Sequence, residues 1–118
     1  MAGIKDLLGE FTKVEGVKTA VVVGRDGFVI EGITTDASHD VEAVGAVIST
    51  GLATAEIMGK DLAVGAMSQG MLEYDNGVLL MGSLGQYALL CIVCAPGSNL
   101  GMVRVQIKKY SPLLLEEL

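Results

Sequence analysis

The chain has 118 residues, 51% of them apolar, which is enough to bury the core of a single domain spanning residues 1–118. Fourteen acidic residues against eight basic ones give a net charge of -6 and a pI near 4.6, and aromatic residues make up only 4% of the chain. Such a chain repels polyanions and offers few rings for base stacking, so nucleic acid is a poor partner. The longest apolar run, Tyr87 to Ala95, is far shorter than the ~20 residues of a spanning helix, so we expect a cytoplasmic protein without membrane insertion.

The first half of the chain predicts a helix, a hairpin and a longer helix. Apolar residues recur at helical spacing near the N-terminus, and Gly16 is expected to end that helix. The Asp26-Gly27 pair lies between two apolar runs and favours a tight hairpin turn, because glycine readily supplies positive φ angles. Ser38 or Asp40 can then cap the next helix. The predicted elements are a helix over 4–14, strands over 17–24 and 28–33, and a helix over 41–60.

The second half predicts three more strands and a final helix. Asn76-Gly77 and Gly85-Gln86 are typical hairpin turns, so the strands they join are expected to be antiparallel. Pro112 is expected to bend or fray the last helix. The predicted elements are strands over 63–74, 78–84 and 87–94, and a helix over 100–118.

Both faces of the last two strands are apolar. An antiparallel sheet with one wet face would alternate apolar and polar residues, so these strands need cover on both sides, which three helices can supply. The sequence therefore predicts the α+β class: a five-stranded antiparallel sheet covered by helices on both faces, in the order α-β-β-α-β-β-β-α.

The long helix predicted over 41–60 has two different faces. At 100° per residue, one face is apolar and is expected to pack on the sheet. It consists of Val41, Val44, Ile48, Leu52, Ala55 and Leu62, with Val47 and Met58 beside it. The opposite arc is small or uncharged, which favours close contact with a second helix from another chain over exposure to water. It consists of Ala43, Ala46, Thr50, Ala53, Thr54 and Ile57.

With these elements in this order, the chain resembles the Roadblock/LC7 family over nearly all of its length. The stretches that carry the resemblance are VVVGRDGFVIEG, the small-residue helix over 41–60, YDNGVLLMGSLGQYALLCIV and NLGMVRVQIKKY. The resemblance implies that the middle helix covers one face of the sheet and the terminal helices the other. It also implies dimers formed through the middle helix and the edge strand over 63–74.

The expected homodimer interface combines the uncharged arc with this edge strand. It comprises Ala43, Ala46, Val47, Thr50, Ala53, Thr54 and Ile57 from the helix, and Ala66, Ser68 and Gly70 from the strand.

Cys91 and Cys94 have the spacing of a redox or metal pair, but they lie in a predicted strand. Residues three apart on a strand point to opposite faces and lie ~10 Å apart, beyond the reach of a disulfide. We expect two buried core thiols.

Other residues that could carry chemistry have simpler explanations. His39 is the single histidine and is expected to be a solvated loop residue, so we expect no metal site. Ser98 or Asn99 reads as a helix cap, since no phosphate-binding lysine follows it, and we expect no cofactor. Arg25 could reach a partner from its turn as an arginine finger, but an ordinary exposed arginine is the better interpretation.

Three functions from different classes are consistent with the sequence. The leading one, which the resemblance implies, is a noncatalytic dimeric regulator of a Ras-like small GTPase. The alternatives are a dimeric adaptor that links larger assemblies and, weakest, a thiol enzyme. The residues expected to contact a GTPase are Ser38, His39, Asp40, Glu42, Glu56 and Lys60.

Overall fold

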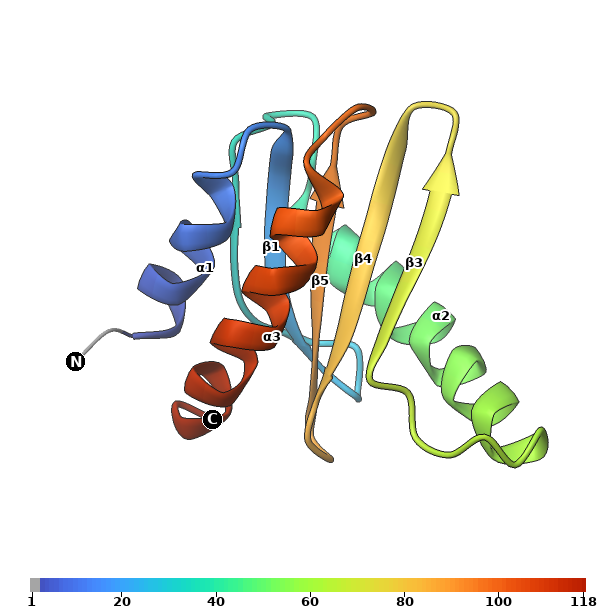
Figure 1. Ribbon diagram of the computed structural model, residues 1–118. Helices are drawn as coiled ribbons and strands as arrows, with labels where there is room; N and C mark the ends of the chain where they lie inside the picture. The colour runs from blue at the N-terminus through green and yellow to red at the C-terminus, as the bar shows by residue number, and fades with distance from the viewer. Residues whose placement is uncertain (1–2) are drawn as a thin grey trace.

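Residues 3–118 are described by a computed structural model, in which the helices and strands follow the predicted order α-β-β-α-β-β-β-α (Figure 1). The elements are α1 (Ile4–Thr12), β1 (Val17–Gly24), β2 (Val29–Thr34), α2 (Val41–Asp61), β3 (Gln69–Tyr74), β4 (Gly77–Leu84), β5 (Ala88–Cys94) and α3 (Leu100–Glu116).

The five strands form one sheet in the spatial order β2-β1-β5-β4-β3, and every neighbouring pair is antiparallel. The three predicted hairpins are confirmed. Gly27 adopts a φ of 91° in the first turn, where Asp26 Oδ1 accepts a hydrogen bond from the Phe28 amide at 3.1 Å. The second turn lies one residue earlier than expected, because Gly77 already pairs with Tyr74 and begins β4.

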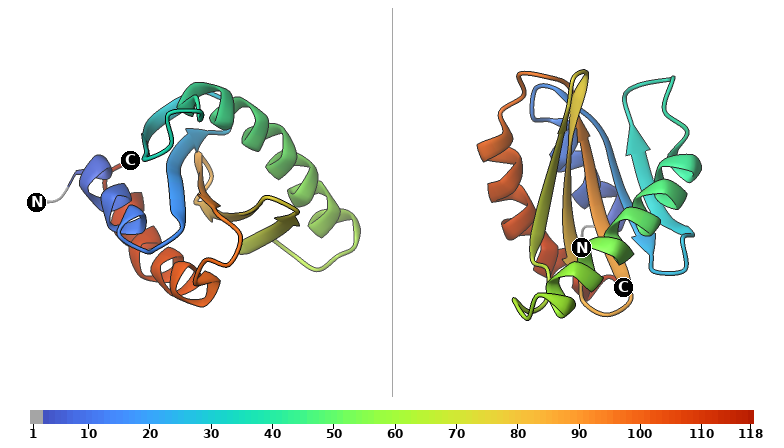
Figure 2. Two further views of the ribbon diagram at one scale, coloured as in Figure 1. Left: turned by 90° about the horizontal axis from the view of Figure 1, so that it is seen from above. Right: turned by 90° about the vertical axis from the view of Figure 1, so that its right-hand side faces the viewer.

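Helices cover both faces of the sheet, as predicted. Helices α1 and α3 lie on one face, and α2 crosses the other, which the two views of Figure 2 show from above and from the side. Each face has its own core: Phe11 and Ile107 belong to the core on the α1 and α3 side, while Ile48 and Leu52 belong to the core on the α2 side. The predicted division, with the middle helix on one face and the terminal helices on the other, is confirmed.

The predicted start of the third strand is wrong. The strand was expected from residue 63, but β3 begins at Gln69. After α2 ends, Ala63 takes a left-handed φ of 57°, and the Val64 amide donates to the Gly59 carbonyl at 3.0 Å. Gly65, with a φ of 94°, turns the chain again. Residues 62–68 therefore form a connection that leads from the end of α2 to the sheet.

The final helix continues through Pro112 to Glu116. Asn99 caps its start, since the Asn99 side chain accepts a hydrogen bond from the Met102 amide at 3.1 Å. Pro112 lies on the exposed side of α3, so its ring replaces a hydrogen bond that faces water and the helix does not end there.

Candidate interaction surface

Helix α2 packs on the sheet through about its first three turns, where Val41 and Val44 are partly buried. Gly45, Ile48 and Leu52 are its buried residues. Gly45 permits the close approach, because a Cβ at that position would lie 2.5 Å from Val29 Cγ2. The expectation that Val47, Met58 and Leu62 pack on the sheet is wrong, since they are 71%, 57% and 70% exposed.

The reason is the path of α2, which contacts β1 and β2 near its start and whose last turns project past the β3 edge of the sheet (Figure 1). Apolar residues keep their helical spacing through the last turns of α2, but no strand of the described chain packs against them. Met58 and Leu62 therefore remain exposed to solvent.

The structure places the predicted arc on the outward side of α2, where Val47 beside the arc is exposed and so are all six residues of the arc: Ala43, Ala46, Thr50, Ala53, Thr54 and Ile57. The hydroxyls on this side are turned back onto the helix. Thr50 Oγ1 donates to the Ala46 carbonyl and Thr54 Oγ1 to the Thr50 carbonyl, both at 3.3 Å. The arc therefore presents methyl groups and little hydrogen-bonding capacity to its surroundings.

Length and composition alone would allow α2 to cross a membrane. Its mean hydropathy reaches 1.4 over 18 residues, only 17% of which are buried within the chain. No long continuous apolar run marks this helix in the sequence, because glycine and threonine interrupt the runs without adding charge. Anchorage of Ile48 and Leu52 on the sheet ties α2 to a folded domain, so cover by another protein surface fits its geometry better than lipid.

Strand β3 forms one edge of the sheet and, within residues 3–118, pairs with β4 alone. Gly70 lies in this edge, but Ala66 and Ser68 precede the strand, so the expectation that they belong to it is wrong. Leu72 is opposite Leu79, which packs in the core on the α2 side, so Leu72 lies on the same face of the sheet as α2. Leu72 was not among the expected interface residues and is 44% exposed.

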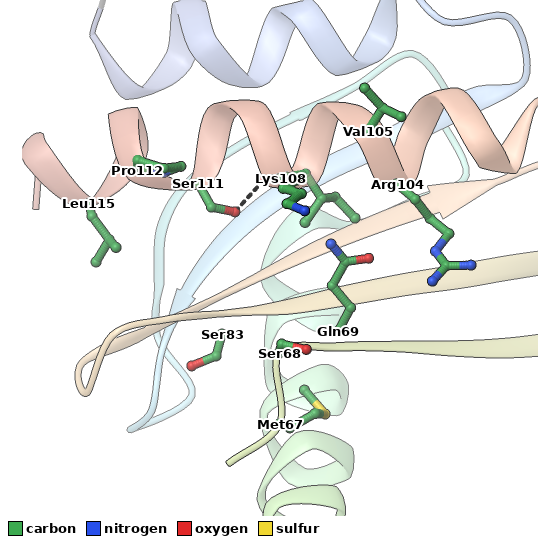
Figure 3. A pocket seen from close by; sticks show the side chains of 11 residues that line it. Met67, Ser68, Gln69, Ser83, Arg104, Val105, Lys108, Ser111, Pro112 and Leu115 are labelled. Atoms are coloured by element: carbon green, nitrogen blue, oxygen red, sulfur yellow. Dashed lines mark hydrogen bonds between the residues drawn. The ribbon is translucent and has the colours of Figure 1, made fainter. Parts of the chain in front are cut away.

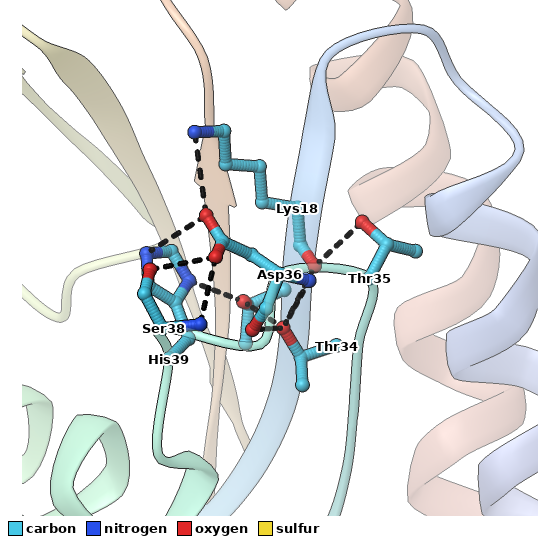
Figure 4. A network of polar contacts seen from close by, with 7 residues as sticks. Lys18, Thr34, Thr35, Asp36, Ser38 and His39 are labelled. Carbon is cyan, nitrogen blue, oxygen red and sulfur yellow. Dashed lines mark hydrogen bonds and ion pairs between the residues drawn. The ribbon is translucent and has the colours of Figure 1, made fainter.

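Four of the six residues expected to contact a GTPase are engaged within the chain. Ser38 donates to Asp36 Oδ1 through its amide at 2.9 Å and its hydroxyl at 2.6 Å (Figure 4). His39 is half-buried, with Nδ1 2.7 Å from Thr19 Oγ1 and Nε2 3.8 Å from Asp36 Oδ2, so the expectation of a solvated loop histidine is wrong. Sequence reasoning missed the partner Thr19 because it lies on another element.

These contacts stabilise the charged form of Asp36. The two hydrogen bonds from Ser38, followed by Lys18 and His39 nearby, lower the pKa of Asp36 to about 2. Asp40 is the cap of α2, since its side chain accepts a hydrogen bond from the Glu42 amide at 3.1 Å. This polar network therefore fixes the loop that leads into α2.

Glu56 is held by Arg25 in an ion pair between α2 and the first hairpin turn. The same guanidinium donates to Ser83 Oγ at 3.2 Å and to the Gly85 carbonyl at 2.9 Å. An arginine finger would have to give up all these contacts, so the structure favours a structural role for Arg25. Of the expected GTPase contacts, Glu42 and Lys60 are exposed and form no ion pair within residues 3–118.

The six residues do not form one cluster in a single chain. Glu42 and Glu56 are fourteen positions apart on α2, a separation of about 21 Å along the helix axis.

Cys91 and Cys94 are buried, unpaired thiols, as predicted. They belong to the two different cores, Cys91 on the α2 side and Cys94 on the other, so they do not converge. Burial raises the pKa of Cys91 to about 12 and that of Cys94 to about 11, which keeps both protonated and unreactive at neutral pH. This arrangement does not support a thiol enzyme.

Together, the sheet covered on both faces, the exposed α2 and the free edge of β3 define a small α+β protein-interaction domain. Residues 3–94 match the Roadblock/LC7 domain, and the chain belongs to this family. It is 35% identical over 106 residues to the uncharacterized protein MJ0310 of Methanocaldococcus jannaschii, a match that covers 90% of this chain and 91% of that protein.

Two solved structures share the fold. Myxococcus xanthus MglB is 21% identical with a TM-score of 0.87, over 96% of this chain and 92% of the other. The Roadblock/LC7 domain from Streptomyces avermitilis is 18% identical with a TM-score of 0.80, over 97% and 99% of the two chains. The resemblance that the sequence suggested is therefore confirmed, and the family supports a small regulatory or adaptor domain.

Proposed function

We propose that the protein is a noncatalytic homodimer that regulates a Ras-like small GTPase, with α2 and the edge of β3 as the dimer interface. The dimer is proposed from the uncharged outer arc of α2, where the large apolar side chains of Ile57 and of Val47 beside the arc are 57% and 71% exposed. Small residues allow two helices to approach closely, and a second copy supplies such a partner by two-fold symmetry.

The edge of β3 supports the same proposal. An exposed edge strand offers unpaired backbone groups to another strand. Leu72 and the arc of α2 lie on the same side of the sheet, so one partner can cover both. Pairing of two β3 strands would extend the sheet across both chains.

The dimer is tested by placing a charge in the arc. Thr50→Glu would bury an unpaired carboxylate, which costs about 3 to 5 kcal/mol and weakens the dimer by more than about a hundred-fold. The matched control is Met102→Glu, which adds the same charge at an exposed position of α3, on the other face of the sheet. Light scattering at micromolar concentration should report twice 12.2 kDa for the natural protein and the control, and 12.2 kDa for Thr50→Glu.

Gly51 offers a second, milder test of the same surface. Nothing lies within 4 Å of a Cβ built at this exposed position, so Gly51→Leu is compatible with the single chain. A close-packed second helix would be pushed away by the larger side chain. A monomeric natural protein, or a dimer that tolerates both Thr50→Glu and Gly51→Leu, would contradict the proposed interface.

The GTPase is proposed from membership of the family, whose members include MglB-type regulators of Ras-like GTPases. Glu42 and Lys60 are the expected contacts whose charges are free for a partner, and we expect them to orient the GTPase. Hydrolysis would then be stimulated by ordering of the partner's own catalytic groups, since Arg25 is already engaged.

The proposed regulation of a GTPase is tested by calorimetric titration of this protein with a small GTPase whose gene lies next to its own. We expect binding that depends on the nucleotide state and weakens in the charge reversals Glu42→Lys and Lys60→Glu. Met102→Glu again serves as the control. Binding of no such GTPase in either nucleotide state would favour the alternative, a dimeric adaptor.

A further inference from the structure

A groove of about 890 Å³ lies on the face of the sheet opposite α2, between α3 and the strands β3 and β4 (Figure 3). Arg104 and Lys108 project into it from α3, and Gln69 projects toward them from β3. The groove follows α3 from Arg104 to Leu115, which are eleven positions and therefore about 16 Å apart along the helix axis.

Arg104 and Lys108 have no acidic partner. Both are exposed, and within residues 3–118 neither forms an ion pair or a side-chain hydrogen bond. They are four positions apart on one helix face, where two like charges destabilise a helix by about 0.2 to 0.5 kcal/mol. Lys109, the third cation of α3, lies 5.3 Å from the centre of the Tyr110 ring instead.

The charge of α3 differs from that of the rest of the chain. Helix α3 contains three of the eight basic residues and one of the fourteen acidic ones, Glu116, which is its last residue and does not line the groove. Glu73 is the one acid of β3, and its pairing with Val78 places it on the same face of the sheet, but it does not line the groove. The groove is therefore a basic site on a protein with a net charge of -6.

The two ends of the groove differ in chemistry. The end near Arg104 and Lys108 is cationic, whereas Pro112 and Leu115 make the other end apolar (Figure 3). Leu115 is 43% exposed, although it is a large apolar side chain. A ligand that fits both ends has carboxylates followed by an aliphatic side chain.

We propose that this groove binds an acidic segment of a partner protein, with carboxylates on Arg104 and Lys108 and an aliphatic anchor against Leu115. About 16 Å accommodates roughly five residues of extended chain, which is a peptide-sized site. The groove is on the opposite face from α2, so this inference does not depend on the proposed GTPase. Occupation of both faces would let the protein link two partners.

Fluorescence polarisation with a labelled peptide of three Glu-Glu-Leu repeats tests the groove on the full-length protein. Measurements are made at about 50 mM salt, where screening is weak. We expect micromolar binding that weakens at least ten-fold in the double variant Arg104→Glu, Lys108→Glu, and also weakens in Leu115→Asn. The control is the double variant Lys5→Glu, Lys13→Glu, with Lys5 in α1 and Lys13 directly after it. This control changes the net charge equally and should bind within two-fold of the natural protein.

Four results would overturn the proposal. The first is no binding by the natural protein, and the second is equal loss in the α1 control, which would make the effect one of net charge. The third is equal binding of a Gln-Gln-Leu peptide, which would make the groove merely apolar. The fourth is a change of mass by light scattering in the groove variant, which would mean that a second copy of this chain covers the groove. Circular dichroism spectra identical to that of the natural protein confirm that each variant is folded.

Discussion

The close approach of α2 to the sheet rests on Gly45, and replacing this residue tests the packing that leaves the rest of α2 exposed. In Gly45→Ala the new Cβ would lie 2.5 Å from Val29 Cγ2 and 3.4 Å from Val23 Cγ2. Neither valine can move freely, because Val23 is buried and both side chains are β-branched. The helix or β2 must therefore shift.

Two opposing effects determine how much Gly45→Ala changes the free energy of unfolding. Alanine is favoured over glycine inside a helix by about 0.8 to 1.0 kcal/mol, whereas overpacking costs about 1 to 3 kcal/mol. We expect Gly45→Ala to lower the free energy of unfolding by about 0 to 2 kcal/mol in total. The control is Gly9→Ala in α1, where nothing lies within 4 Å of the added Cβ, so only the favourable effect of about 1 kcal/mol acts. The difference between the two variants measures the collision, about 1 to 3 kcal/mol.

Urea unfolding at one protein concentration measures both variants, since the stability of a dimer depends on concentration. In a double-mutant cycle, Gly45→Ala should cost much less stability in the Val29→Ala background than in the natural protein, because the colliding methyl group has been removed. Equal stabilisation by Gly45→Ala and Gly9→Ala, with no coupling to Val29, would refute this account of how α2 packs on β2.

Three further predictions concern stability and pH. Ala63 has a left-handed φ of 57° just after α2, so Ala63→Gly should raise the free energy of unfolding by up to about 1 kcal/mol, measured by urea titration; a loss would contradict the left-handed conformation. The pKa of Asp36 is lowered from 3.8 to about 2, so its stabilising effect is present above pH 3.8 and is lost as the pH falls toward 2. Asp36→Asn should flatten that acid dependence, and an unchanged profile would exclude the network with Ser38. Burial raises the pKa of Cys91 from 9.0 to about 12 and that of Cys94 from 9.0 to about 11. The contribution of the two protonated thiols to the free energy of unfolding is therefore complete below pH 9.0 and is lost as the pH rises through those values. Ellman's reagent should accordingly titrate both thiols in urea and neither in the native protein, and fast native reaction would show that they are accessible.

The sequence by itself determined the order of the elements and the division of the sheet into two apolar faces. Alternation along β5 was enough to separate Cys91 from Cys94, because side chains on a strand point alternately to the two faces. Helical spacing likewise located the outward arc of α2 from Ala43 to Ile57, since a period of 3.6 residues depends only on the local backbone. Periodicity of this kind requires no knowledge of what lies opposite.

Only the tertiary structure decided what each face meets. The apolar pattern of α2 continues to Leu62, yet the sheet covers it only as far as Leu52, because the last turns of the helix do not lie against a strand. The ion pair of Arg25 with Glu56 joins residues 31 positions apart, and the contact of Thr19 with His39 joins residues 20 apart. Such contacts depend on how distant elements are placed in space, and no local pattern in the chain records that placement. For the same physical reason, the sequence gives no sign that Arg104 and Lys108 differ from ordinary surface cations. Only the structure shows that α3 and β3 form one groove around them.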